Sequence, residues 1–365
     1  MNAKINGIDP DIRQAATLDT AFYTEEAMFR EARERVFARS WQWLGDTRDV
    51  AQPGSVAPCE MLAGLLNEPL MLSRDADGNL RCLSNVCTHR GNILVHQACQ
   101  LKEIRCGYHA RRFDLAGTML SMPEFSDAKN FPSTADNLPA LPFGSWKGHA
   151  FASIAPAAPL AEFMAEIEAR LSWMPIEDFV HDPNRDRDFD LDAHWALYVE
   201  NYLEGFHIPF VHAGLNAVVE YGSYASEIGR YANLQLAIAR EGEPAFDIPA
   251  GSPDHGKRVA AYYWWVFPNL MFNFYPWGLS LNLIRPQARE RTRISFRSFV
   301  WDADKLEQGA GAGLDRVEME DEEIVRAVQR GVRSRFYQHG RYSPTRERGV
   351  HHFHRLLCEF MAGAT

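Results

Sequence analysis

The chain is 365 residues long, which is more than one compact domain usually holds, so two domains are expected. Its formal net charge of -10 argues against nucleic acid as a partner, because nucleic-acid binding needs a basic surface. No signal peptide or membrane span is expected, since the N-terminus lacks an apolar core and the longest apolar stretch, 260–284, is interrupted by prolines. The six scattered cysteines predict reduced thiols and a cytoplasmic location.

The first half of the chain predicts a short helical segment followed by a small β domain. Residues 20–40 carry apolar side chains at helical spacing, within an N-terminal segment, 1–40, that we expect to pack on the catalytic domain. Between 41 and 155 short β-type runs alternate with turn signals such as QPGS and DADGN, which predicts a small all-β domain. A linker at 153–163, SIAPAAPLAEF, leads into the second domain, 156–365.

The second half predicts helices around an antiparallel sheet. A helix containing WALYVENYLEGFH comes first, and strands are expected at 258–267, 269–275, 278–285 and 292–301. Two helical segments close the chain. This order predicts an α+β fold in which helices flank an antiparallel sheet in a helix-grip-like arrangement.

Two loops of the first domain each carry one cysteine and one histidine. NVCTHRGN contains Cys87-x-His89, and RCGYHARRFD contains Cys106-x2-His109 after sixteen intervening residues. A structural zinc site is one interpretation, although zinc sites usually pair like ligands. One thiolate and one imidazole per loop instead favour a two-iron cluster, in which two thiolates hold one iron and two imidazoles hold the other. Such a cluster carries single electrons, so an acceptor is expected elsewhere.

The stretch VENYLEGFHIPFVHAGL supplies candidate ligands for a second metal. Glu204 and His207 are three residues apart and are expected on one face of a helix. His207 and His212 are five apart, so an unbroken helix could not direct both at one atom, and Pro209 is expected to break it. Two histidines and one carboxylate form the facial triad of non-haem iron(II) oxygenases.

The carboxylate of that triad is expected from the helix that starts near Asp315. Its sequence predicts an apolar stripe made of Val317, Ile324, Val325, Val328 and Val332. Asp321 falls in the middle of this stripe, where a carboxylate is costly unless it is paired or bound to a metal. The other acids of this helix, expected to point sideways or away, are Glu318, Glu320, Glu322 and Glu323. The alternative is a buried aspartate satisfied by an arginine or a backbone donor.

With both motifs in place, the chain resembles the oxygenase (alpha) component of the Rieske non-haem iron oxygenases over nearly its whole length. It is most similar to the branch with choline, glycine betaine and carnitine monooxygenases. The resemblance implies a 2Fe-2S Rieske cluster on Cys87, His89, Cys106 and His109, and a mononuclear iron on His207, His212 and Asp321. It also implies a homotrimer in which Glu204 bridges histidine ligands of two metals across the subunit interface.

The second cluster loop departs from the family pattern. Members commonly have Cys-Pro-Tyr-His-Gly-Trp, whereas this chain has Gly107 for the proline and Ala110 and Arg111 for the last two residues. Both ligands are present, so the cluster is still expected. We expect Ala110 and Arg111 to border the surface where a reductase docks.

The resemblance further implies reductive activation of O2, with electrons passed from NAD(P)H through a separate flavin or iron-sulfur reductase. The substrate is expected to be a small quaternary-ammonium compound that is hydroxylated or N-demethylated. Aromatic residues between 262 and 277 could bind such a cation by cation-π attraction, or could be ordinary sheet core. Two alternatives remain: a ring-hydroxylating oxygenase for an aromatic acid or hydrocarbon, and a non-catalytic Rieske electron carrier.

Overall fold

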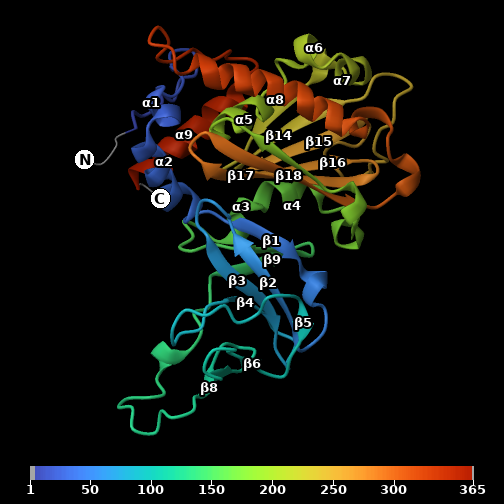
Figure 1. Cartoon of the computed structure of the whole chain (residues 1–365). Helices are drawn as coiled ribbons and strands as arrows, with labels where there is room; N and C mark the ends of the chain where they lie inside the picture. The colour runs from blue at the N-terminus through green and yellow to red at the C-terminus, as the bar shows by residue number, and fades with distance from the viewer. Residues whose placement is uncertain (1–4, 364–365) are drawn as a thin grey trace. The chain divides into compact units, whose positions relative to one another are not determined.

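The computed structural model describes residues 5–363, which fall into two compact units. The small unit is Ala38–Pro156, and the large unit combines the chain up to Phe37 with the chain from Ala157 onward (Figure 1). None of the helices within 5–363 has the length and apolar character needed to cross a membrane. Each unit has its own sheets and its own core, and each is described separately.

The small unit consists of three antiparallel sheets, which confirms the predicted all-β character. Their strands are, in sheet order, β1 (Gln42–Asp46), β10 (His149–Ala152) and β9 (Phe143–Trp146); β4 (Leu80–Ser84), β3 (Glu68–Arg74), β2 (Ser55–Met61) and β5 (Cys99–Gln100); and β6 (Ile104–Arg105), β7 (Arg112–Phe113) and β8 (Met119–Ser121). Met71, Leu83 and Phe113 from these strands pack in one buried cluster. Cys87 and Cys106 belong to the same cluster, so the core itself positions both thiols.

The large unit is built on one antiparallel sheet of eight strands. The order is β11 (Val180–His181), β18 (Arg291–Val300), β17 (Gly278–Ala288), β16 (Leu270–Tyr275), β15 (Val259–Val266), β14 (Ala232–Ile238) and β13 (Ala225–Ile228), and β12 (Arg187–Leu191) also pairs with β18. The four strands predicted from sequence correspond to β15 to β18. The other four were not predicted; β14 is buried on both faces and therefore lacks the alternation that marks a half-buried strand.

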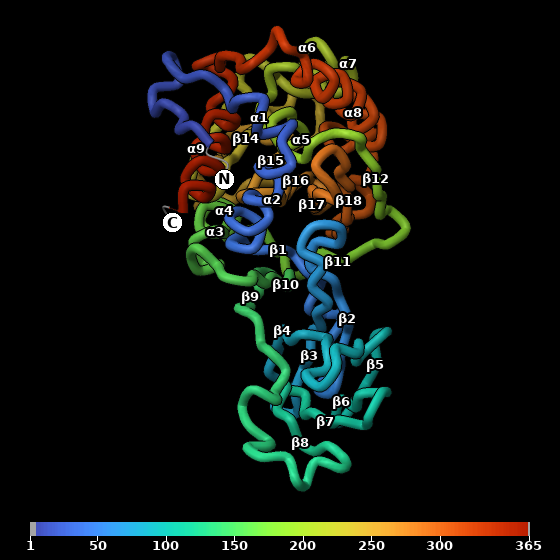
Figure 2. The backbone as a smooth tube through the Cα atoms, turned by 60° about the vertical axis from the view of Figure 1, so that its left-hand side comes forward, coloured from blue at the N-terminus to red at the C-terminus, as the bar shows by residue number. Residues whose placement is uncertain are grey.

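Helices cover this sheet and confirm the predicted α+β class. The longer ones are α5 (Trp195–Tyr202), α8 (Leu314–Gly331) and α9 (Arg348–Ala362). Helix α5 contacts both α8 and β17, so it lies between that helix and the sheet (Figures 1 and 2). The shorter helices are α3 (Leu160–Phe163), α4 (Ala165–Leu171), α6 (Ile208–Val211) and α7 (Ala213–Val218). The N-terminal helical segment is divided into α1 (Ala21–Thr24), α2 (Glu26–Ala32) and a π-helical turn, Arg33–Phe37, that contacts α9.

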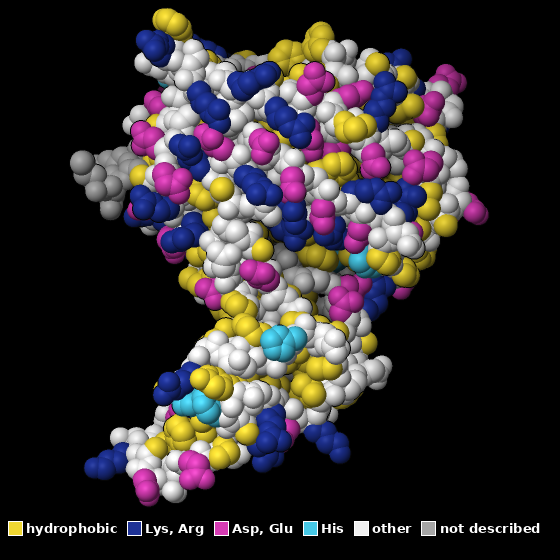
Figure 3. Space-filling view, viewed as in Figure 1, with side chains coloured by type: hydrophobic (Ala, Val, Ile, Leu, Met, Phe, Trp, Pro, Cys, Tyr) yellow, Lys and Arg dark blue, Asp and Glu magenta, His cyan; other side chains and the backbone are white. Residues whose placement is uncertain are grey.

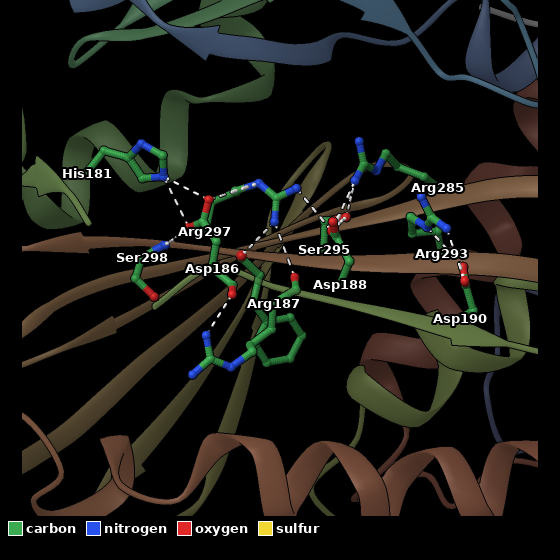
Figure 4. A network of polar contacts seen from close by, with 11 residues as sticks. His181, Asp186, Arg187, Asp188, Asp190, Arg285, Arg293, Ser295, Arg297 and Ser298 are labelled. Carbon is green, nitrogen blue, oxygen red and sulfur yellow. Dashed lines mark hydrogen bonds and ion pairs between the residues drawn. The ribbon is translucent and has the colours of Figure 1, made fainter. Parts of the chain in front are cut away.

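Strand β12 is joined to its neighbours by a ladder of charged side chains (Figure 4). Asp188 accepts from Arg297 at 3.0 Å, and Asp190 accepts from Arg293 at 2.9 Å. Exposed ion pairs of this kind contribute about 0 to 1 kcal/mol each. Their main effect is on register, because a shift of β12 by one residue would turn both carboxylates to the opposite face. Elsewhere on the large unit, the face drawn in Figure 3 also intersperses basic and acidic side chains.

His194, which precedes α5, makes the stability of the large unit depend on pH. It is fully buried, its Nδ1 accepts the backbone N–H of Ala196, and burial lowers its pKa to about 3. The unfolded chain has the ordinary histidine pKa near 6.5, so acid favours the unfolded state. The stabilisation from neutral His194 is complete above about pH 6.5 and is lost as the pH falls towards 3.

We therefore expect His194→Asn to weaken the acid sensitivity of folding. Asparagine can accept the same N-cap hydrogen bond but has no proton to gain. The melting temperature, followed by circular dichroism, should fall less between pH 7 and pH 5 than in the wild type, whatever its absolute value. The exposed His255→Asn is the control. Equal pH slopes for wild type and His194→Asn would contradict this account.

Candidate functional site

Three predicted ligands of the large unit lie together in space. His207 and His212 flank the short helix α6, and Asp321 lies on α8. The two Nε2 atoms are 3.0 Å apart, and Asp321 Oδ1 lies 3.0 Å from Nε2 of His212 and 3.4 Å from Nε2 of His207. One donor atom from each residue lies within 4.8 Å of the others. Two imidazole nitrogens and one carboxylate oxygen are the donor set of a facial triad.

A carboxylate stands behind each imidazole and sets its orientation. Nδ1 of His207 lies 2.7 Å from Glu204 Oε1, and Nδ1 of His212 lies 2.8 Å from Glu320 Oε2. A carboxylate accepts hydrogen bonds, so each Nδ1 carries the proton and each Nε2 directs its lone pair towards Asp321. Two lone pairs converging within 3.0 Å repel unless a cation lies between them, so these residues fit a single iron ion.

The electrostatics of the site agree with this interpretation. Burial disfavours the charged form of His212, but hydrogen bonds to Asp321 and Glu320 outweigh burial and raise the pKa of His212. In return, the hydrogen bond from His212 lowers the pKa of Glu320. The site therefore attracts positive charge, whether it comes as a proton or as a metal ion.

The local backbone differs from the prediction around Glu204. Helix α5 ends at Tyr202, so Glu204 and His207 do not share a helix face. They meet because Glu204 Oε2 also accepts the backbone N–H groups of Phe206 and His207, which folds the carboxylate over the turn. Pro209 does not break a helix either; it lies in the first turn of α6, where its missing N–H costs nothing.

Gly205 is required by the close packing of this turn. A Cβ atom at this position would lie 2.4 Å from the ring of Tyr224. Only glycine allows the ring to approach the backbone beside Glu204. The turn and the ring are thus fixed together.

The predicted apolar stripe of α8 is confirmed at Val325 and Val332 but wrong at two other positions. Ile324 and Val328 are 39% and 42% exposed, whereas Glu318 and Glu322 are buried. The remaining buried residues of α8 are Val325 and Gln329. The helix can bury these polar groups because each finds a partner: the Tyr198 hydroxyl binds Glu318, Arg326 binds Glu322 at 2.6 Å, and the backbone N–H of His194 donates to Gln329 at 2.7 Å.

Asp321 lies beside this buried face and is partly buried. The side-chain amide of Asn201 donates to its Oδ1 at 2.6 Å. Its partners are therefore an amide and the two imidazoles, in place of the arginine or backbone donor of the alternative interpretation.

Asn201 and Glu320 are both functional candidates that sequence reasoning missed. Glu320 is adjacent to Asp321, but α8 brings it to His212 only through tertiary packing.

A cavity of about 710 Å³, counting its opening to solvent, lies beside the triad. Its aromatic lining consists of Tyr198, Tyr202, Tyr224, Tyr263, Tyr275 and Phe296, and its polar lining includes Asn201, Gln235, Asn273, Ser280, Asn282 and Glu318. Within the described residues 5–363, no lysine or arginine lines it.

Only part of the aromatic stretch at 262–277 contributes to this cavity. Tyr263 and Tyr275 line it, whereas Trp265 and Phe272 are fully buried in the sheet core, as the second interpretation of these residues predicts. Tyr202 and Tyr224 come from outside that stretch and were not identified from sequence. Burial raises the pKa of all five lining tyrosines, so they stay neutral; they are Tyr198, Tyr202, Tyr224, Tyr263 and Tyr275.

The predicted cluster ligands lie in two loops of the small unit. Cys87 and Cys106 are buried, His89 is partly exposed and His109 is exposed. The two imidazole rings lie 4.8 Å apart between centroids. The Asn92 amide and the Tyr108 backbone N–H reach Cys106 Sγ at 3.7 and 3.5 Å. Thiols that face the core and imidazoles that face outward fit a two-iron cluster whose histidine-bound iron is nearer to solvent.

Arg111 does not border the surface, contrary to the prediction. Its side chain is 2% exposed and pairs with Asp136 at 2.6 Å, and its guanidinium lies 5.8 and 5.5 Å from the ring centroids of Phe113 and Phe131. Thr88 of the first cluster loop donates to the backbone carbonyl of Asp136 at 2.7 Å. The Arg111–Asp136 pair therefore ties both cluster loops to one segment, and Ala110 takes a φ of +57° to turn the chain there.

We expect Arg111→Gln to loosen the cluster loops. The change leaves Asp136 without its cationic partner and leaves a polar group between two phenyl rings. The temperature at which the visible absorbance of the cluster is lost should fall by about 5 °C or more. Arg112→Gln is a matched control, because the adjacent Arg112 is exposed and pairs with Glu103 on the surface. Equal losses for the two variants would refute the structural role of Arg111.

We expect Glu320→Gln to weaken iron binding without affecting the cluster. Glutamine can still accept from His212, but the negative charge that increases imidazole basicity is gone, and such changes typically cost about 10- to 100-fold in metal affinity. Iron retained after dialysis against graded chelator measures the effect. The exposed Glu323→Gln on the same helix is the control. Wild-type retention in Glu320→Gln would show that the carboxylate behind His212 is dispensable.

An electron-carrying cluster unit joined to a unit with a facial triad and an adjacent cavity defines a Rieske-type oxygenase. Residues 40–132 match the Rieske [2Fe-2S] domain, and residues 172–363 match the ring hydroxylating alpha subunit (catalytic domain). The chain belongs to the ring-hydroxylating alpha-subunit family, whose members are oxidoreductases.

Named relatives cover nearly the whole chain. The chloroplastic choline monooxygenase of Arabidopsis thaliana is 27% identical over 375 residues, which is 97% of this chain and 85% of that protein. The carnitine monooxygenase oxygenase subunit of Escherichia coli is 27% identical over 363 residues, 95% of this chain and 94% of that protein.

A solved structure shows the same fold. The quaternary ammonium Rieske monooxygenase CntA in complex with its substrate L-carnitine superimposes with a TM-score of 0.75, at 23% identity, over 97% of each chain. Naphthalene 1,2-dioxygenase from Rhodococcus reaches a TM-score of 0.73 at 18% identity, over 96% of this chain and 95% of that chain. The predicted architecture of a Rieske domain plus a catalytic domain is confirmed.

Proposed function

We propose that this chain is the terminal oxygenase component of a system that hydroxylates or N-demethylates a small quaternary-ammonium compound. The observation that carries the proposal is the cavity beside the triad. It combines neutral tyrosine rings, which attract an organic cation, with a lining that is acidic and, among residues 5–363, free of lysine and arginine. Relatives that act on choline and carnitine support this substrate class.

In this proposal His207, His212 and Asp321 hold the mononuclear iron, which when bound supplies the reductive activation of O2. The other roles in the reaction fall to side chains of this protein. Glu204 and Glu320 hold the imidazole rings in their ligating orientation, and tyrosine rings orient the substrate and exclude water.

Cys87, His89, Cys106 and His109 would hold the 2Fe-2S cluster, which when bound would supply single electrons. Of these residues His109 is exposed and His89 is partly exposed. We further propose a homotrimer in which Glu204 connects His207 to the cluster of a neighbouring subunit. Two observations support an interface here: Glu204 already binds His207, and the phenyl rings that follow it, Phe206 and Phe210, are 41% and 79% exposed.

A separate flavin or iron-sulfur reductase, drawing on NAD(P)H, would supply the electrons. The relative from Escherichia coli is an oxygenase subunit, which fits a system with more than one component. The six free cysteines fit a reducing compartment, and we propose the cytoplasm.

The two other functions have less support. A ring-hydroxylating oxygenase is favoured by the family match and by the fold shared with naphthalene 1,2-dioxygenase, but a hydrocarbon makes no use of four carboxamides and three carboxyls in the cavity wall. A simple electron carrier has no need of the triad or of the cavity.

The test is oxygen uptake by the holoprotein with a reductase and NADH, across choline, carnitine, glycine betaine, benzoate and naphthalene, with product analysis. We expect uptake with at least one ammonium compound and formation of the oxidised product. Asp321→Ala should abolish product and remove one iron per chain while the cluster absorbance persists. Asp315→Ala, an exposed acid on the same helix, is the control. Product formation from aromatic compounds alone would contradict the proposal.

A further inference from the structure

One carboxyl in the cavity is not accounted for by the metal site. Glu318 lines the cavity from α8 and is 2% exposed. One of its oxygens, Oε2, binds the Tyr198 hydroxyl, whereas Oε1 is buried and has no hydrogen-bond partner. A buried polar atom without a partner costs free energy, and native structures rarely keep one without a use.

Arg326, the basic residue of α8 whose charge acts on Glu318, is already engaged. Arg326 forms its ion pair with Glu322, at 2.6 Å. Burial raises the pKa of Glu318 well above its usual range, and the Asp321 and Glu322 carboxylates add to this effect. The free protein therefore lacks the positive charge that an ionised Glu318 needs.

The other acids of the cavity wall are occupied. Glu204 binds His207, and Asp321 binds Asn201 and the two imidazoles. Of the lining acids in the described chain, Glu318 is the one with a buried oxygen that has no hydrogen-bond partner. The same lining contains no lysine or arginine within residues 5–363, so a carboxylate group of a ligand would meet acids and no counter-charge.

We propose that Glu318 Oε1 is the substrate-recognition group of this cavity, and that it selects a cationic amino alcohol of the choline type over ammonium compounds that carry a carboxylate. The tyrosine rings enclose the methylated ammonium group, and Glu318 supplies the negative charge next to it. Asn282 and Ser280, which also line the cavity and hydrogen-bond each other at 2.8 Å, offer polar partners to the hydroxyl end. This inference rests on the proposed function and makes it more specific.

The experiment compares choline with its uncharged isostere 3,3-dimethylbutan-1-ol, and with carnitine and glycine betaine. The holoprotein is used after iron and cluster contents have been measured. Binding is measured by calorimetry for all four compounds, and kcat/KM from oxygen uptake coupled to product. We expect choline to bind more tightly than its isostere and than either carboxylated compound.

Glu318→Gln should weaken choline binding by about tenfold or more, because a charge-assisted contact is lost. The affinity for the uncharged isostere should change by less than about threefold. The ratio of the affinities for choline and the isostere separates recognition from a structural role, since misfolding would weaken the binding of both compounds alike. Glu323→Gln, an exposed change of the same kind on the same helix, should leave the ratio unchanged. If Glu318→Gln does not load iron, Glu318→Asp, which keeps the charge and shortens its reach, is measured in the same way.

The outcomes separate the two proposals. If no ammonium compound is oxidised, the proposed function itself fails. If ammonium compounds are oxidised but carnitine or glycine betaine binds as well as choline, or Glu318→Gln keeps the wild-type ratio, the proposed function stands and the role of Glu318 is overturned.

Discussion

The site depends on a row of buried polar contacts between α5 and α8. Tyr198 binds Glu318, Asn201 binds Asp321 at 2.6 Å, and the N–H of His194 binds Gln329 at 2.7 Å. An apolar interface of the same size would allow α8 to slide or rotate at little cost, whereas each polar group here would lose its partner. The contacts thus fix the rotation of α8, and that rotation places Asp321 opposite the two histidines and Glu320 behind one of them.

The small unit uses the same principle around its cluster loops. Arg111 is buried beside two phenyl rings and forms an ion pair with Asp136. The backbone carbonyl of Asp136 also accepts a hydrogen bond from the Thr88 hydroxyl. Burying a guanidinium there has a desolvation cost, but the buried ion pair fixes the loops in one arrangement. This explains how the chain can have arginine where the family commonly has tryptophan. The arginine side chain packs on aromatic rings, as tryptophan can, and also forms an ion pair.

The sequence predicted what is local and missed what depends on distant partners. The spacing of Cys87, His89, Cys106 and His109, and the positions of β15 to β18, follow from short patterns within one loop or strand. The orientation of α8 does not, because its burial of Glu318 is made possible by Tyr198, 120 positions away. Periodicity found an apolar stripe with Ile324 and Val328, but it cannot say whether a neighbour covers that stripe. The ligand assignments themselves remain predictions, with a geometry that suits them.

The charges around the triad give one further reason to connect the metal with a cationic substrate. Glu204, Asp321 and Glu318 line the cavity, and Glu320 lies behind His212. Of these four carboxyls only Glu320 has an arginine or lysine partner, Arg316 at 3.1 Å, among the ion pairs of the described chain. A divalent iron offsets two of the remaining charges. If Glu318 is ionised in the complex, one negative charge is left, and a singly charged ammonium group beside it completes the balance. A carboxylated betaine has no net charge and would leave that carboxyl uncompensated in a buried wall, which is the costly arrangement that protein interiors avoid.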